Sequence, residues 1–152
     1  MPEQLLHSTG DAPWLPAGGR ADVVRSAVPP SPVGLVRLLA RDGSAVFCAA
    51  RDDGRVDLPT RVVPADDPDG SVTAARLTRE VLGDGPRAVP VGFVRNVVAA
   101  PDPDYAWPTP LAHFAVWTAV GVPRGAGEWV DVADATCVLR NRHWWPLLAA
   151  DL

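Results

Sequence analysis

The sequence predicts an α/β protein in which a mixed β-sheet lies between two helices. Three observations predict this class. Most of the chain after residue 32 consists of short β-prone runs, only two long segments carry helix signals, and the order is strands, helix, strands, helix without an internal repeat. The length of 152 residues fits a single domain. We therefore expect one α/β/α sandwich with a helix on each face of the sheet.

The first 32 residues are expected to form an extended N-terminal arm. They are rich in proline and show no sustained hydrophobic period, so the one regular element expected there is a short helix around residues 21–27. The domain itself is expected to span residues 33–152. It begins with two strands, VGLVRLLA and SAVFCAA, because both runs are β-prone and Asp42-Gly43 between them is a hairpin turn signal.

The first of the two main helices is expected from residue 72 to about residue 82. Ser71 is the expected N-cap, apolar residues at spacings of three and four form one stripe, and Gly83 ends the helix. Long strands are expected next in AVPVGFVRNVVAA and LAHFAVWTAV, because their apolar and polar residues alternate. The second helix is expected over residues 132–148, with an interruption at Pro146.

The charged residues argue against several functions. The formal net charge is −4 and every basic residue other than histidine is arginine. This argues against nucleic-acid binding and excludes Schiff-base and P-loop chemistry, because both require a lysine amine. Cys48 and Cys137 stand apart in apolar runs and are expected to be buried thiols. Without a signal-peptide pattern or an apolar run of about 18 residues, we expect a cytoplasmic protein that does not bind membranes.

Residues at the centre of the chain form part of a known motif. Leu58-Pro59 precedes a turn-rich loop, and the expected helix carries Arg79-Glu80-Val81, followed further on by GEWVDVADA and RNRHWWPLL. These segments resemble the Nudix hydrolase superfamily over about residues 33 to 150. The resemblance implies an α/β/α sandwich and the hydrolysis of a nucleoside diphosphate linked to another moiety, with Mg²⁺ or Mn²⁺ as cofactor.

Most metal-binding positions of that motif hold other residues. In the family, glutamates one helical turn apart converge on Mg²⁺. Counting from Arg79 places Ser71 at the upstream glutamate, while Gly83 and Asp84 stand at the paired glutamates. Glu80 is retained in its expected place. Asp84 lies beyond the expected helix end, so it is a weaker candidate ligand than Glu80.

The positions around the helix depart from the motif as well. Thr60 and Arg61 stand where paired glycines usually follow Leu-Pro. The loop PADDPDG offers Asp66, Asp67 and Asp69 as substitute ligands. Aspartates that precede a glycine are, however, usually turn formers or charges at a helix start, and the sequence leaves both interpretations open.

The candidate site residues carry proton-transfer, aromatic or anion-binding side chains. The catalytic candidates, chosen because carboxylates and histidines transfer protons, are Glu80, His113 and His143. The substrate-binding candidates are Arg79, Trp117, Arg140 and Trp144, and the metal-ligand candidates are Glu80 and Asp84. For the aromatic residues and both histidines, packing in the core is the structural alternative.

Three functions follow from these observations, and the sequence leaves open whether the protein is an enzyme. The first is a divergent Nudix-fold protein that has lost conventional multi-metal pyrophosphohydrolase activity and binds, or transforms by acid–base chemistry, a small metabolite. The second is an atypical hydrolase that uses Mg²⁺ or Mn²⁺. The third is a non-catalytic interaction module that pairs with another protein or forms a homodimer.

Overall fold

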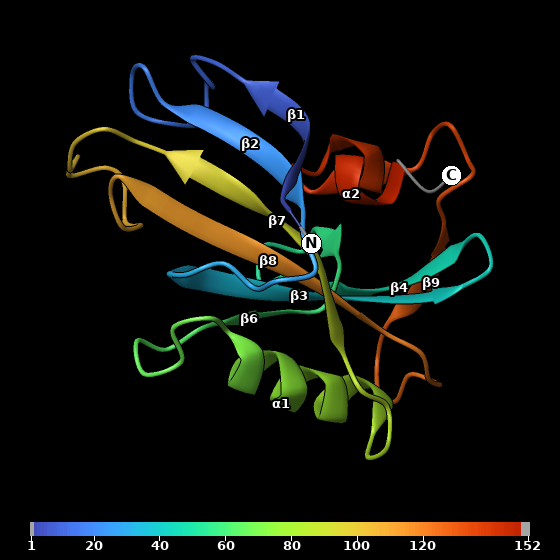
Figure 1. Cartoon of the computed structure of the whole chain (residues 1–152). Coiled ribbons are helices and arrows are strands. Elements are labelled where there is room, and N and C mark those ends of the chain that lie inside the picture. Colours follow the sequence, from blue (N-terminus) through green and yellow to red (C-terminus); the bar gives the residue numbers. More distant parts are fainter. Residues whose placement is uncertain (1, 150–152) are drawn as a thin grey trace.

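The computed structural model describes residues 2–149 and contains a nine-stranded mixed sheet with helices on both faces, so the predicted fold class is confirmed (Figure 1). Residue 1 of the expected arm and residues 150–152 of the expected domain lie outside the described residues. The strands are β1 (Gln4–Thr9), β2 (Arg20–Arg25), β3 (Val33–Asp42), β4 (Ala45–Ala50), β5 (Val56–Asp57), β6 (Thr60–Val62), β7 (Val89–Val97), β8 (Leu111–Ala119) and β9 (Glu128–Asp131). The helices are α1 (Ser71–Leu82), a 3₁₀ helix (Val138–Asn141) and α2 (Trp145–Ala149).

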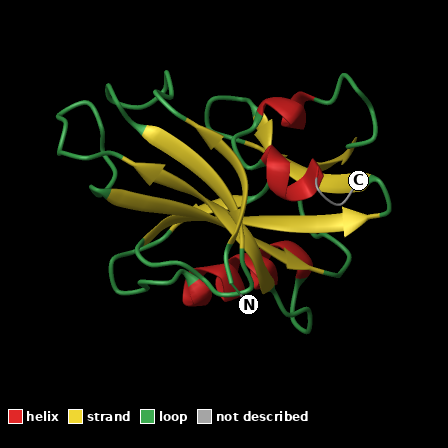
Figure 2. Cartoon of the chain, turned by 45° about the horizontal axis from the view of Figure 1, so that its top comes forward, coloured by secondary structure: helices red, strands yellow, loops and turns green. Residues whose placement is uncertain are grey.

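The strands follow the order β1-β2-β7-β8-β3-β4-β5, with β6 beside β3 and β9 beside β4. β3 and β8 run parallel, with Leu38 opposite Trp117, and the other strand pairs described are antiparallel. Figure 1 shows α1 below the sheet and α2 above it, and Figure 2 shows the same two layers from a turned view. No described helix combines the length and hydropathy needed to span a bilayer.

Alternation of side chains divides the core into two layers. Because neighbouring residues of a strand point to opposite faces, β3 directs Val36 and Leu38 to the α1 side and Leu39 to the α2 side. Leu77 of α1 packs in the first layer and Leu147 of α2 in the second. Each buried leucine contributes about 1.5–3 kcal/mol, so both helices are held mainly by these contacts.

Both cysteines are free and buried, as the sequence predicts. Burial, reinforced by the negative charge of Asp57, raises the pKa of the Cys48 thiol to about 12. A thiol with so high a pKa is not a nucleophile at neutral pH.

The N-terminal segment lies within the sheet rather than apart from it. The helix expected around residues 21–27 is wrong, because Arg20–Arg25 forms β2 and pairs with both β1 and β7. Val23 and Val24 point to opposite faces and are both buried. β-Branched residues buried on both faces suit an interior strand, and this pairing overrides the local proline signals.

The helix expected over residues 132–148 is also wrong in its extent. A turn-rich stretch, the 3₁₀ helix and the short α2 occupy this segment instead. Asp131 accepts a hydrogen bond from the backbone N–H of Ala133, and Asp134 accepts one from that of Thr136, so these aspartates favour turns over helix. Pro146 lies in the first turn of α2, where its missing N–H costs little, and therefore starts the helix rather than interrupting one.

Candidate functional site

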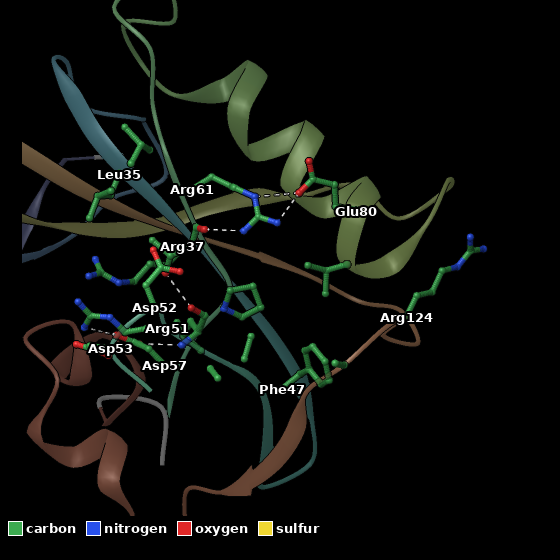
Figure 3. Close-up of a pocket in the computed structure, with 18 residues that line it drawn as sticks. Leu35, Arg37, Phe47, Arg51, Asp52, Asp53, Asp57, Arg61, Glu80 and Arg124 are labelled. Carbon is green, nitrogen blue, oxygen red and sulfur yellow. Dashed lines mark hydrogen bonds and ion pairs between the residues drawn. The ribbon is translucent and has the colours of Figure 1, made fainter. Parts of the chain in front are cut away.

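A cavity of about 570 Å³ lies beside α1, at the end of the sheet formed by β3, β4, β5 and β6 (Figure 3). Leu58 and Pro59 of the motif line it, as does Glu80. Its charged lining consists of Arg37, Arg51, Arg61, Arg124, Asp52, Asp53, Asp57 and Glu80. We call this the arginine pocket.

Arg61 is ion-paired to the one glutamate that the motif retains. Its Nε and Nη2 atoms lie 3.0 and 2.8 Å from Oε2 of Glu80, and both side chains remain about half exposed at the pocket. Arg61 belongs to β6 and also donates to the carbonyl of Thr60, which fixes the guanidinium on the side facing α1. A guanidinium therefore occupies the position beside Glu80 at which the resemblance implies a metal ion.

The end of α1 places the second carboxylate away from the first. Gly83 has φ of 78°, in the left-handed region that glycine tolerates, and the helix stops there. Asp84 beyond it is 92% exposed and pairs with Arg79 at 3.3 Å. Asp84 lines a different cavity, of about 430 Å³, together with Arg79 and Trp117. The structure therefore does not bring Glu80 and Asp84 together.

Arg124 covers the C-terminal end of α1. Its backbone N–H donates to the carbonyl of Val81 at 2.6 Å, and a Cβ added at Gly83 would lie only 2.5 Å from Cζ of Arg124. The guanidinium of Arg124 thus packs against the position of the first paired glutamate. A cation at a helix C-terminus is favoured by the helix dipole, so this arrangement is electrostatically stable.

The loop aspartates serve the start of α1. Asp67 is buried; one carboxylate oxygen accepts from the N–H of Val72 at 3.3 Å, and the other accepts from the N–H and the hydroxyl of Thr73, both at 2.7 Å. Asp69 accepts from the N–H of Ser71 at 2.9 Å. The N-cap residue is Gly70, so the N-cap role expected for Ser71 is wrong. The helix-start interpretation of Asp67 and Asp69 is confirmed.

The described side chains do not fit the Mg²⁺ or Mn²⁺ site that the resemblance implies. Within residues 2–149, no group of three or more His, Cys, Asp or Glu side chains is arranged to hold a metal ion. Glu80 faces a guanidinium, and Asp84 points into solvent. Mg²⁺ needs oxygen ligands that converge, and guanidinium groups stand where these ligands would be.

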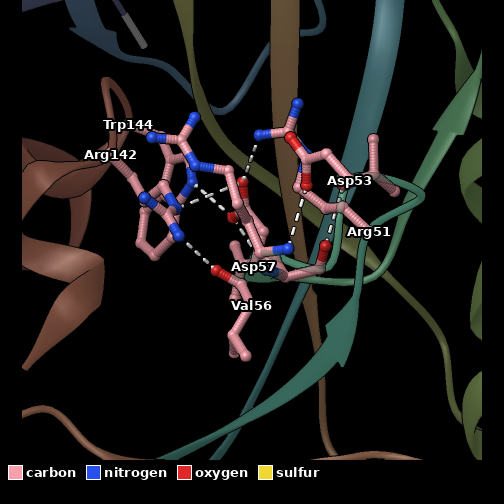
Figure 4. Close-up of polar contacts among 9 residues, drawn as sticks. Arg51, Asp53, Val56, Asp57, Arg142 and Trp144 are labelled. Atoms are coloured by element: carbon pink, nitrogen blue, oxygen red, sulfur yellow. Dashed lines mark hydrogen bonds and ion pairs between the residues drawn. The ribbon is translucent and has the colours of Figure 1, made fainter.

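Asp57 is the centre of a polar cluster in the wall of the arginine pocket (Figure 4). This carboxylate is only 1% exposed. Its Oδ1 accepts from the N–H of Leu58 at 2.8 Å and from Nε1 of Trp144 at 3.0 Å. Its Oδ2 lies 3.5 Å from Nη1 of Arg51 and 3.6 Å from Nε of Arg142. Trp144, a predicted substrate-binding residue, is buried and orients this carboxylate.

Arg37 on β3 reaches the same region. Burial lowers the pKa of its guanidinium, Asp57 partly offsets this, and Arg51 and Arg142 lower it further. Its Nε is buried and has no hydrogen-bond partner within residues 2–149. The pocket wall therefore contains a partly desolvated cation with unused hydrogen-bonding capacity.

His113 lies in the core on the α1 side of the sheet. It is 2% exposed, its Nδ1 lies 2.8 Å from the carbonyl oxygen of Pro32, and its Nε2 accepts a hydrogen bond from Nε of Arg95 at 3.1 Å. Burial lowers the pKa of its imidazole; the Pro32 carbonyl and Glu3 raise it, and Arg95 lowers it. His113 does not line the arginine pocket.

The stability of the protein is expected to fall as the pH drops below about 6.5, in part through His113. Since its pKa is lower in the folded state, the unfolded chain takes up the proton first, and stability falls until the lowered folded-state pKa is passed. His113→Gln should flatten this dependence in urea unfolding at pH 5, 6 and 7.5. His7→Gln, at an exposed position, is the control. Equal slopes for the wild type and His113→Gln would contradict the assignment.

The remaining predicted site residues lie elsewhere. Arg140 and His143 line a cavity of about 320 Å³ beside α2, where His143 stacks on Trp14 at 4.2 Å between ring centroids. The structure therefore distributes the sequence-predicted residues over several sites. Sequence reasoning missed Arg37, Arg51, Arg61, Arg124 and Asp57 as site residues. The sequence contains one sign of this pocket: Arg61 directly follows Leu-Pro-Thr, where the motif has a glycine.

Comparison with solved structures finds a neighbour of the same fold. It is a mutant of the Bacillus subtilis pyrophosphohydrolase BsRppH, with a TM-score of 0.57 and 10% sequence identity, and the match covers 91% of this chain and 84% of that chain. No family model and no curated protein matches the sequence. At this level of identity the likeness shows the fold alone, and that fold is the Nudix fold.

Proposed function

We propose that this Nudix-fold protein binds a small anionic metabolite through arginine side chains, and that it has lost conventional multi-metal pyrophosphate hydrolysis. One observation carries the proposal. Two guanidinium groups occupy the end of α1 where the motif would place metal-binding carboxylates and their cations: Arg61 on Glu80, and Arg124 against Gly83.

The charged lining of the arginine pocket consists of four arginines and four carboxylates, so the support for an anionic ligand comes from the arginines that form no ion pair. Asp57 is paired with Arg51 and Arg142, which gives that group a net positive charge. Arg37 and Arg124 form no ion pair within residues 2–149. The guanidinium group presents its donors in a planar fork that matches phosphate or carboxylate oxygens, so these arginines can bind an anion without a metal.

If the ligand is also transformed, Glu80 is the acid–base group proposed for this pocket. It is about half exposed and lies within the pocket lining, so a bound ligand can reach it. A carboxylate that a bound ligand can reach suits the role of general base.

The proposal predicts binding of inorganic pyrophosphate in the presence of EDTA. Isothermal titration should show saturable binding, and Arg61→Ala should weaken it about tenfold or more, because a charge-assisted hydrogen bond is lost and Glu80 is left without its counter-ion. Arg76→Ala, which removes an exposed arginine of α1 outside the pocket, should leave binding unchanged.

Hydrolysis would contradict the proposal. Purified protein with Mg²⁺ or Mn²⁺ should not cleave nucleoside diphosphate derivatives at about 1 s⁻¹ or faster. If it does, and Glu80→Gln abolishes the activity, the protein is a metal-dependent hydrolase. A rise in melting temperature with millimolar Mn²⁺ that Asp84→Asn removes would support the same conclusion.

A further inference from the structure

Four aspartates in this chain are followed directly by glycine: Asp42, Asp53, Asp69 and Asp84. An Asp-Gly site is the least hindered place for one reaction of the backbone, because a glycine has no Cβ to keep its nitrogen from the preceding side chain. The glycine nitrogen attacks Cγ of the aspartic acid, a C–N bond forms, and a water molecule leaves. The product is a five-membered succinimide ring.

Water then opens the ring at one of its two carbonyl carbons. Attack at Cγ restores aspartate. Attack at the main-chain carbonyl carbon breaks the original peptide C–N bond, and the chain then runs through Cβ and Cγ as isoaspartate. One water leaves and one enters, so the reaction is an isomerisation that needs no other reactant. Since glycine follows the aspartate at all four sites, we expect the structure to decide which site reacts fastest.

Hydrogen bonds hold both reacting groups of Asp53. Its Oδ1 accepts from the backbone N–H of Arg55 at 2.9 Å. The N–H of Gly54, whose nitrogen would attack, donates to the carbonyl of Arg51 at 2.8 Å. Ring closure at this site has to break both hydrogen bonds, so we expect it to be slow.

Asp69 and Asp42 are restrained as well. Oδ1 of Asp69 accepts from the N–H of Ser71 at 2.9 Å. The N–H of Gly70 donates to the carbonyl of Asp67 at 3.1 Å. Asp42 is the last residue of β3 and pairs with β4 across the hairpin turn. Strand pairing fixes the backbone that would have to rotate before the carboxyl group could meet the nitrogen.

Asp84 lacks these restraints. It lies in the loop between α1 and β7, at the lower edge of Figure 1, and its side chain is 92% exposed. The N–H of Gly85 donates no hydrogen bond within residues 2–149. The space around this glycine is open, since an added Cβ would meet nothing within 4 Å. The carboxylate forms an exposed ion pair with Arg79 at 3.3 Å, and pairs of this kind hold a side chain only weakly.

We propose that Asp84-Gly85 is a site of spontaneous isoaspartate formation and reacts fastest of the four Asp-Gly sites in the folded protein. The product adds one backbone carbon to the loop after α1. Its carboxylate is attached directly to Cα, so the ion pair with Arg79 loses its present geometry. Asp84 does not line the arginine pocket, and the proposal does not rest on anion binding there.

Ageing of the purified protein for several weeks at neutral pH and physiological temperature tests the proposal. Peptide mapping with electron-transfer fragmentation separates isoaspartate from aspartate, and heavy-oxygen water labels a carboxylate that has passed through a succinimide. In the folded protein, isoaspartate at residue 84 should exceed that at residues 42, 53 and 69 about tenfold or more. In urea, where the restraints are gone, the four sites should agree within about threefold.

Two conservative variants assign the reaction to one residue. Asp84→Glu keeps the negative charge, but its longer side chain would have to close a six-membered ring, which forms far more slowly. A carboxyl methyltransferase specific for isoaspartate, with labelled S-adenosylmethionine, should therefore transfer little label to aged Asp84→Glu. Asp42→Glu is the matched change at another exposed Asp-Gly site and should accept as much label as the aged wild type.

The absence of isoaspartate at residue 84 after ageing would overturn the proposal. Equal amounts at residue 84 and at any of the other three sites in the folded protein would also overturn it, because the restraints described would then have no effect. Methyl transfer to Asp84→Glu at the wild-type level would have the same consequence.

Discussion

Replacement of Asp57 by alanine is expected to destabilise the protein by about 3–5 kcal/mol, the largest effect of any substitution considered. Its carboxylate is buried and accepts two hydrogen bonds, and two arginines face it. Without it, Arg142, whose side chain is 14% exposed, remains close to Arg37 with no counter-ion, and the indole N–H of Trp144 loses its acceptor. Uncompensated buried charge of this kind is costly.

Urea unfolding of Asp57→Ala against Asp52→Ala measures this effect. Asp52 is an exposed carboxylate of the same pocket, so its removal should change the free energy of unfolding by no more than about 0.5 kcal/mol. A double variant that also carries Arg51→Leu should recover part of the loss, because one unpaired cation is removed. Equal stability of the two single variants would show that the Asp57 cluster contributes nothing to folding.

Replacement of Asp67 by alanine is expected to cost about 2–3 kcal/mol. This buried carboxylate accepts from the backbone N–H groups of Val72 and Thr73 and from the Thr73 hydroxyl. Its negative charge also lies at the positive end of the α1 dipole. The substitution leaves the first turn of α1 with unpaired donors. The stability of the protein and the position of Glu80 on α1 therefore both depend on the Asp67 carboxylate.

The neighbouring Asp66 provides the matched control for this prediction. Asp66 is exposed, so Asp66→Ala should leave the midpoint of thermal unfolding within about 2 °C of the wild type. Asp67→Ala should lower it by several times that amount. If both alanine variants melt together, the hydrogen bonds of Asp67 do not stabilise the helix start.

Elements with strong local signals could be predicted from the sequence. The stripe of α1 and its end at Gly83 are local, as are the alternation in β7 and β8 and the turn at Asp42-Gly43. β2 could not be predicted, because its evidence is long-range pairing with β7 while its neighbours are prolines and glycines. The segment before α2 is not the helix that its apolar residues predict, because these residues serve burial against the sheet, and burial needs no helical period.

The candidate site could likewise be predicted only in part from the sequence. The retention of Glu80 and the loss of the paired glutamates follow from counting along one helix. The arginine pocket does not, because Arg37, Arg61 and Arg124 come from β3, β6 and the loop after β8, and only the tertiary structure brings them together. Arginine is abundant in this chain, so the sequence does not indicate which single arginines meet in one pocket.

The parallel pairing of β3 with β8 has a consequence for how the chain folds as it is made. Val33 and its partner His113 are separated by most of the domain, so the centre of the sheet cannot close until β8 has emerged from the ribosome. Until then β3 and β7 each present an open edge of unpaired backbone groups. A nascent or truncated chain that ends before Leu111 therefore exposes two unpaired strand edges at once. Such edges can pair with other chains, so folding without aggregation depends on how soon the rest of the protein is synthesised.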